Sequence, residues 1–237
     1  MPRPLPSRLL VVLEPADCRP ALLQALHAGG ARWFWLRAKD LPAEGQRAAV
    51  ADFRAALPAA DAVLSLGARI QARTFVTLGL VPRVHGDAGA NQPVDARDKP
   101  EHDHRLGMHL PRDADPAAAR AALGPEALLG VSAHDGGELA RAAAAGADYA
   151  TLSPLFPTAS KPGAPALGLE VFARLAADAG LPVLALGGVG PAQVAAALDA
   201  GAAGVAVRGA LNRASDPAAA VAAMRQALEA ARPGWGE

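Results

Sequence analysis

The chain has one cysteine, few aromatic residues and no excess of either charge. The single cysteine, Cys18, excludes an internal disulfide and fits a reducing compartment. Lysine plus arginine equal aspartate plus glutamate at 23 each, so no general field attracts nucleic acid or an acidic membrane surface. No apolar run approaches the roughly 18 residues of a membrane span, and the first run is too short for a signal peptide. We therefore expect a soluble, cytoplasmic protein without nucleic-acid or membrane partners.

Short apolar runs alternate with alanine-rich helical patterns along most of the 237 residues. Such alternation implies a parallel sheet, and eight units close naturally into a barrel. The sequence therefore predicts one α/β domain over residues 1–237, a single (β/α)8 TIM barrel. The predicted strands are 8–14, 33–38, 62–66, 107–110, 128–133, 149–153, 183–186 and 205–207. The predicted helices are 19–28, 42–57, 68–78, 116–123, 137–145, 169–179, 192–200 and 217–231.

One segment, residues 81–105, departs from this alternation. It carries charges of both signs and no hydrophobic period. We interpret it as a polar surface insertion in the barrel.

Function in a parallel barrel gathers at the carboxyl ends of the strands. The second predicted strand ends with Arg37 and Lys39, two residues apart and therefore on one side of the sheet. They are either two solvated surface cations or an anion site. An arginine facing the barrel mouth requires an anion, which favours the second interpretation.

The fifth predicted strand ends with Ser132 and His134, which again share one side. Asp135 and Glu138 are spaced as an N-cap and its capping-box partner. His134 then lies just outside the helix and faces the mouth, where an imidazole can transfer protons near neutral pH.

The sixth strand leads into a loop that carries Thr158, Ser160 and Lys161. Hydroxyl donors and a flexible cation are the usual means of holding phosphate or pyrophosphate. A turn of this composition is often only a loop, but its position before the glycine-bearing strand favours ligand contact.

The last two strands end in Gly187 and Gly188, and in Arg208 and Gly209. Glycine lets a ligand approach the main chain closely, and the last two units of a barrel often form its phosphate site. The sequence therefore predicts a phosphate cup here, and a phosphorylated small molecule as ligand.

These features together resemble the thiamine phosphate synthase family, including its TenI-type thiazole tautomerase branch. The resemblance runs from about Leu9 to Leu211. Its motifs are Gly-Val-Ser-Ala-His from Gly130, Ala-Asp-Tyr, Phe-Pro-Thr-Ala-Ser-Lys, Leu-Gly-Gly-Val and Gly-Val-Ala-Val. The family is a (β/α)8 barrel whose synthase joins an aminopyrimidine methyl pyrophosphate to a thiazole phosphate, with Mg²⁺. Its tautomerase moves a proton within a thiazole carboxylate phosphate.

The resemblance assigns roles residue by residue. Arg37 and Lys39 match an Arg-x-Lys pair that binds the pyrophosphate. Ser132 matches a serine near the pyrophosphate, and Lys161 matches a lysine that stabilises the pyrophosphate as it leaves. Thr158 and Ser160 match hydroxyl residues near the thiazole phosphate and the reacting centre. The phosphate cup matches Gly188, Arg208 and Gly209, and His134 falls where the tautomerase places its catalytic histidine.

Several positions depart from the synthase pattern. Trp35 stands where the pattern has glutamine, and the segment from Ser65 to Ala68 lacks the expected Asn-Asp pair. Asp113 and Asp115 flank the position of the expected metal-binding aspartate. Gly209 replaces the cup serine, and Arg208 is expected to supply the missing contact.

The departures leave three functions. The first, which the sequence favours, is TenI-like tautomerase chemistry without a cofactor: His134 shuttles the proton, Arg37 and Lys39 hold the carboxylate, and the cup holds the phosphate. The second is the coupling reaction, with pyrophosphate held by the same two cations, Ser132 and Lys161. There Asp113 or Asp115 would help to bind Mg²⁺, and the aminopyrimidine pyrophosphate is a second small-molecule partner. The third is a non-catalytic barrel that binds a thiazole phosphate. The sequence leaves a homo-oligomer open.

Overall fold

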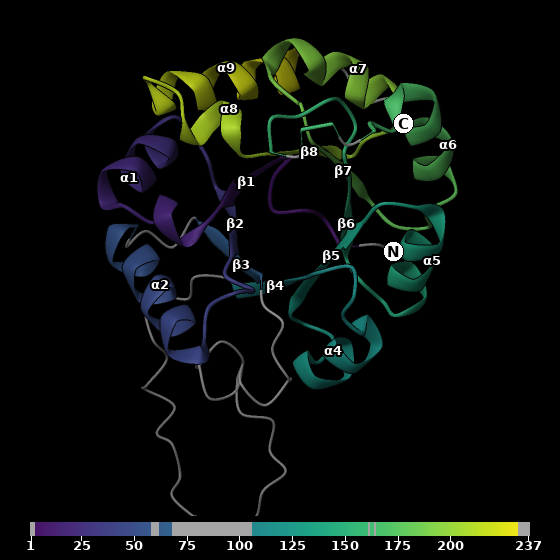
Figure 1. Ribbon diagram of the computed structural model, residues 1–237, viewed down its shortest axis with the longest axis horizontal. Helices are drawn as coiled ribbons and strands as arrows, with labels where there is room; N and C mark the ends of the chain where they lie inside the picture. The colour runs from purple at the N-terminus through teal and green to yellow at the C-terminus, as the bar shows by residue number, and fades with distance from the viewer. Residues whose placement is uncertain (1–2, 58–61, 68–105, 161, 164, 232–237) are drawn as a thin grey trace, which may run out of the picture.

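A computed structural model describes residues 3–57, 62–67, 106–160, 162–163 and 165–231. Within them, the strands form a closed barrel in which each pairs in parallel with its sequence neighbours and β8 returns to β1 (Figure 1). The predicted (β/α)8 barrel is confirmed. The strands are β1 (Leu9–Leu13), β2 (Trp33–Arg37), β3 (Val63–Gly67), β4 (Leu106–Leu110), β5 (Leu128–Ala133), β6 (Tyr149–Leu152), β7 (Val183–Leu186) and β8 (Gly204–Val207).

Helices surround the barrel in an outer ring (Figure 1). They are α1 (Pro20–Ala28), α2 (Ala43–Ala56), α4 (Pro116–Leu123), α5 (Gly136–Ala144), α6 (Gly168–Ala177), α7 (Val194–Asp199), α8 (Gly209–Asn212) and α9 (Pro217–Ala230). Two 3-10 turns, η1 (Pro15–Asp17) and η2 (Pro191–Gln193), precede α1 and α7. No helix in the described ranges has the length and apolar character needed to cross a membrane.

The predicted elements agree closely with these bounds. Every strand is found within one residue of its predicted ends. Helix 192–200 is divided between η2 and α7, and the short helix α8 was not predicted. The predicted helix 68–78 and the insertion at 81–105 lie outside the described residues.

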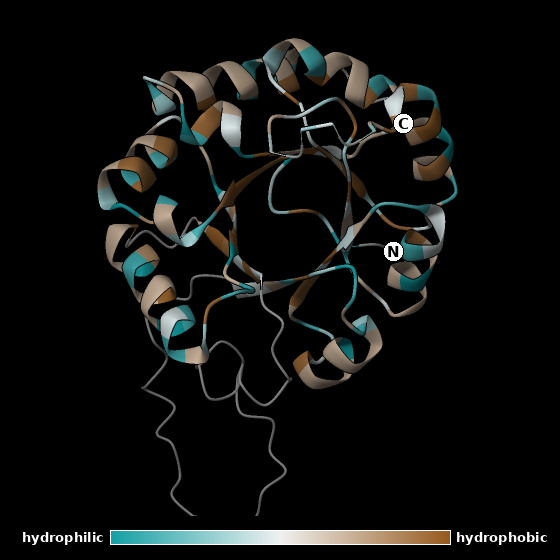
Figure 2. Ribbon diagram, in the orientation of Figure 1, coloured by the Kyte–Doolittle hydropathy of each residue, from teal (hydrophilic) through white to brown (hydrophobic). Residues whose placement is uncertain are grey.

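The strands are apolar on both faces because each face packs against something, as in other parallel sheets. In β1, Leu9, Val11 and Leu13 face the helices, whereas Leu10 and Val12 belong to a second core inside the barrel. Figure 2 shows the strands as mostly hydrophobic and the helix ring as mixed. Polar residues at inward positions near the strand ends therefore face the barrel mouth.

Large aromatic side chains fill part of the barrel interior. The rings of Trp33 and Tyr149 meet edge to face with centroids 4.7 Å apart, a favourable geometry for aromatic pairs. Gly130 makes room for Tyr149, because a Cβ at residue 130 would collide with its ring. This packing supports the residues that line the mouth above it.

Candidate active site

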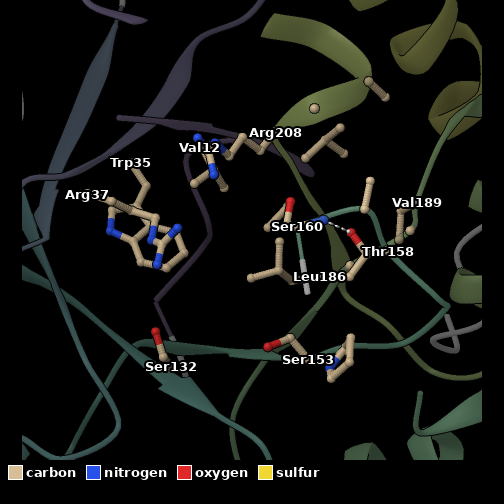
Figure 3. Close-up of a pocket in the computed structure, with 18 of the residues that line it drawn as sticks. Val12, Trp35, Arg37, Ser132, Ser153, Thr158, Ser160, Leu186, Val189 and Arg208 are labelled. Atoms are coloured by element: carbon tan, nitrogen blue, oxygen red, sulfur yellow. Dashed lines mark hydrogen bonds between the residues drawn. The ribbon is translucent and has the colours of Figure 1, made fainter. Parts of the chain in front are cut away.

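A cavity of about 880 Å³ lies at the carboxyl ends of the strands (Figure 3). Residues at or just after the ends of all eight strands line it. Its size falls within the roughly 300–1,000 Å³ typical of small-molecule sites. Active sites of this fold lie at this end of the barrel, so we treat the cavity as the candidate active site.

Two arginines on its wall share one carboxylate. Arg37 ends β2 and Arg208 follows β8, and their Nη1 atoms lie 3.1 and 2.9 Å from the same Oε1 atom of Glu14. All three side chains are about one third exposed. Glu14 directly follows β1, the strand between β2 and β8 in the barrel. The neighbouring strands thus bring together two cations that are far apart in sequence.

Two further cations, Lys39 and Arg213, line the same cavity. Neither has an ion-pair partner among the described residues. The Arg213 guanidinium lies over Gly209, where an added Cβ would collide with its nitrogens. Arg208 was expected from the sequence to replace the cup serine. In the structure its Nη1 pairs with Glu14, and the Arg213 guanidinium occupies the space beside Gly209 instead.

The ends of β7 and β8 present main-chain donors to the cavity. Gly187 and Gly188 have φ values of +99° and +68°, a region that favours glycine. The N–H groups of Gly188, Val189, Gly209 and Ala210 make no hydrogen bond to any other described residue. All four residues line the cavity. Gly188 and Ala210 are exposed, whereas Gly209 is half-buried and Val189 is buried. N–H groups that point into a cavity without a protein partner can donate to an anion, so this wall is suited to bind one.

The loop after β6 supplies hydroxyl groups. Thr158 and Ser160 line the cavity, and the Thr158 hydroxyl accepts a hydrogen bond from the Ser160 N–H at 3.3 Å (Figure 3). Thr158 therefore shapes its own turn and is half-buried, whereas Ser160 is exposed. Lys161, assigned to the same loop, lies outside the described residues.

His134 lines the cavity beside α5. Its Nδ1 lies 3.3 Å from Glu138 Oε2, and the same oxygen accepts the His134 backbone N–H at 2.7 Å. Asp135 caps α5 as predicted, accepting the Glu138 N–H at 2.8 Å. The second half of the predicted capping box differs, because Glu138 reaches back to His134 instead of Asp135.

The two candidate metal ligands have different surroundings. Asp113 lines the cavity. Asp115 does not, and its Oδ1 caps α4 by accepting the N–H groups of Ala117 and Ala118 at 2.9 and 3.2 Å. Among the described residues, no three His, Cys, Asp or Glu side chains are arranged to hold a metal. Mg²⁺ often takes only one or two carboxylates plus substrate phosphates, so Asp113 fits an ion that arrives with a phosphorylated substrate.

A fully buried histidine, His109, was not among the predicted site residues. It stacks on Trp35 with ring centroids 3.7 Å apart, and its Nε2 and Nδ1 lie 3.0 Å from Ser132 Oγ and Tyr149 Oη. Burial, and then the charge of Arg37, lower the pKa of His109 from 6.5 to about 3. Gly67 accommodates the indole, because a Cβ there would lie 2.5 Å from Trp35 Nε1.

A sequence signal for His109 did exist. In the predicted strand 107–110, Gly107 and His109 alternate with the apolar Met108 and Leu110. This alternation places His109 on the inner face. Its hydrogen-bond partners come from other strands, which the sequence alone does not align.

Comparison with known proteins identifies related chains. The family model described as thiamine monophosphate synthase matches residues 102–211. A putative thiamine-phosphate synthase of Geobacter sulfurreducens is 38% identical over 194 residues, which are 81% of this chain and 78% of that protein. The thiamine-phosphate synthase of Roseiflexus sp. is 40% identical, over 71% of this chain and 73% of the relative.

Other similarities cover less of the relative or concern the fold alone. The thiamine biosynthesis bifunctional protein ThiM/ThiE of Symbiobacterium thermophilum is 36% identical over 86% of this chain, but the match spans only 38% of that longer protein. A thiamine phosphate pyrophosphorylase from Pyrococcus furiosus superposes with a TM-score of 0.71 at 21% identity, covering 95% of this chain and 98% of the other.

Proposed function

Because the chain belongs to the thiamine-phosphate synthase family, we propose that it joins an aminopyrimidine methyl pyrophosphate to a thiazole phosphate and releases pyrophosphate. The observation that carries this proposal is the pairing of two anion-binding walls in one cavity. One wall carries Arg37 and Lys39, and the other carries the N–H groups of Gly188 and Gly209, which have no partner within the described part of the chain. A reaction between two phosphorylated substrates needs both.

The comparisons support this reaction over the tautomerase that the sequence favoured. The relatives that match most of their own length are named synthases. Glu138 lies 3.3 Å from His134 Nδ1, and its other oxygen pairs with Arg112 at 3.5 Å. In the synthase reaction His134 is given no proton-transfer role, and we assign it to the cavity wall.

The two anions take separate places in this proposal. Pyrophosphate lies against Arg37, Lys39 and Ser132, with Lys161 as a further cation. Negative charge develops on the leaving oxygens as the carbon–oxygen bond breaks, and fixed cations stabilise that charge where it forms. The departing group is then held near the arginines while the new bond to the thiazole forms.

The thiazole phosphate lies in the cup at the ends of β7 and β8. The N–H groups of Gly188, Val189, Gly209 and Ala210 donate to its oxygens, and the Arg213 guanidinium closes the cup over Gly209. Thr158 and Ser160 line the space between the two anions. These positions leave the reacting ends of both substrates at the centre of the cavity.

A magnesium ion would be held by Asp113 together with oxygens of the pyrophosphate and water. When bound, it would neutralise charge on the pyrophosphate as that group leaves. Asp115 has no part in this proposed site, because it does not line the cavity and its Oδ1 caps α4.

Incubation of the purified protein with both substrates and Mg²⁺ tests the proposal. Formation of thiamine phosphate that is lost in Arg37→Ala, but retained in His134→Ala, would support it. If no product forms while the thiazole carboxylate phosphate is isomerised, the tautomerase is correct instead. If neither reaction occurs and the thiazole phosphate still binds, the protein is a non-catalytic binder.

A further inference from the structure

A buried amide in helix α2 holds both ends of the turn that carries Lys39. Gln46 is 2% exposed, and its Nε2 donates to the carbonyl oxygens of Ala38 at 3.1 Å and Leu41 at 2.9 Å. The Leu41 N–H also donates to the Ala38 oxygen, at 3.1 Å. Residues 38–41 therefore form a β-turn whose first and last carbonyls accept from one side chain. Lys39 is the second residue of this turn.

The orientation of the Gln46 amide follows from its partners. Both are carbonyl oxygens, which can only accept, so the amide nitrogen must face them. The Gln46 oxygen is then turned away, and it is buried without a hydrogen-bond partner among the described residues. An unmatched buried oxygen costs free energy, and an apolar side chain at this position would avoid that cost. What the amide contributes here is the pair of hydrogen bonds to the turn.

The turn lies where β2 meets the cavity. The Ala38 N–H donates to the Gly67 oxygen at 2.9 Å, which extends the hydrogen bonding between β2 and β3. Lys39, the next residue, lines the cavity and is half-buried. A lysine ammonium is carried on a flexible four-carbon stem, so its position depends on how firmly the main chain beneath it is held. Arg37 differs, because it lies within β2 and pairs with Glu14.

We propose that Gln46 is a positioning residue that fixes the turn at residues 38–41 and thereby holds the Lys39 ammonium in the cavity wall. Gln46 does not itself line the cavity, so it acts through the main chain on either side of Lys39. Without the two hydrogen bonds the turn is freer, and more conformational entropy is lost when the ammonium binds an anion. Pyrophosphate as that anion rests on the proposed function, whereas the hold on the turn does not.

Amide hydrogen exchange, followed by NMR on the protein without ligand, tests the hold on the turn. Gln46→Met keeps a similar volume but has no N–H to donate. In this variant the Leu41 amide should exchange about tenfold faster than in the parent, the size of one lost hydrogen bond. The Leu57 amide, which donates to the Phe53 oxygen at the other end of α2, should keep its rate. An unchanged Leu41 rate, or equal acceleration of both amides, would overturn the proposal while leaving the proposed function intact.

Calorimetric titration with inorganic pyrophosphate tests the effect on Lys39. We expect Lys39→Ala to weaken binding about tenfold, the size of one hydrogen bond between charged groups. Gln46→Met should weaken it about fivefold, because the ammonium is retained but less well placed. In a Lys39→Ala background the same change should alter the affinity by less than about twofold, since no ammonium remains to be held. Equal losses in both backgrounds, or parent affinity in Gln46→Met, would show that Gln46 does not act through Lys39.

Phe53→Leu is the matched control within the same helix. It removes an aromatic contact with Phe34, whose ring centroid lies 5.3 Å from that of Phe53, about two helical turns beyond Gln46. Urea unfolding should show a lower stability, while the pyrophosphate affinity stays within about twofold of the parent. An affinity that falls as far as in Gln46→Met would mean that a weakened helix explains the loss.

The parent protein separates this proposal from the proposed function. If the parent fails to bind pyrophosphate, the pyrophosphate site of the proposed function is wrong, and the role of Lys39 in it is wrong as well. If the parent binds but the Lys39→Ala background does not cancel the effect of Gln46→Met, only the positioning role is wrong.

Discussion

At the scale of single residues, Glu14 limits the charge of the arginine wall. One of its oxygens contacts both Arg37 and Arg208, so an incoming anion competes with it. Glu14→Gln should tighten pyrophosphate binding by up to about fivefold, because partly exposed ion pairs are worth about 1 kcal/mol at most. Calorimetry at two salt concentrations measures this. Glu126→Gln, which breaks a pair with Arg3, is the control, and weaker binding in Glu14→Gln would show that the carboxylate orients the arginines instead.

Gly209 and Arg213 are expected to act as a pair in the phosphate cup. A side chain at residue 209 would displace the guanidinium that lies over it. Gly209→Ala should therefore weaken thiazole phosphate binding by about tenfold, roughly the loss of one charge-assisted contact. In an Arg213→Ala background the same change should have little effect, which a double-mutant cycle of dissociation constants measures. Equal losses in both backgrounds would mean that residue 209 acts without Arg213.

The residues that the sequence predicted share one property, which is proximity to a strand end. Arg37, Ser132 and Arg208 all line the cavity because the end of a barrel strand faces its mouth. The ion pair between Arg208 and Glu14 could not be predicted, because it depends on how β1, β2 and β8 are aligned in the barrel.

At the scale of elements, the two aspartates before α4 have different roles. Asp115 caps the helix, whereas Asp113 lines the cavity. Asp115→Ala removes an acceptor for two main-chain N–H groups, and should lower the free energy of unfolding by about 1 kcal/mol. The Mg²⁺ concentration for half-maximal activity should not change. Asp113→Asn should raise that concentration. Urea titrations and Mg²⁺ titrations of both variants measure the two effects, and a reversed result would exchange the roles.

Most helices and strands could be predicted because their signals, such as helix caps and hydrophobic periods, lie within the element itself. Asp135 and Asp216 both cap helices through their carboxylates, accepting the N–H groups of Glu138 and Ala219. The helix α8 was missed because its four residues are too few for a helical period. It is held by a distant contact instead, since Asn212 Nδ2 donates to the Val12 carbonyl and to Asp17.

At the scale of the whole molecule, the barrel followed from repetition of one unit. Apolar runs alternate with helical patterns along the sequence, and eight such units close naturally into a barrel. The hydrogen bonds between side chains inside the barrel could not be predicted, because they join five different strands through Trp33, Ser65, His109, Tyr149 and Ser132. Their contacts depend on the stagger between strands, which no short motif encodes.

The buried His109 should make the stability of the whole barrel depend on pH. Its pKa is lowered to about 3 in the folded protein by burial and by Arg37, whereas the unfolded chain binds a proton near pH 6.5. Below about pH 6.5 the unfolded state gains a proton that the folded state does not, so the free energy of unfolding falls as pH falls toward 3.

Between pH 5.5 and 4.5 the parent should therefore lose about 1.4 kcal/mol more than His109→Gln, in which this site cannot titrate. Urea unfolding of both proteins at the two pH values measures the difference, and comparing the two proteins cancels the contribution of other titrating groups. Equal losses would mean that His109 takes up its proton in the folded barrel.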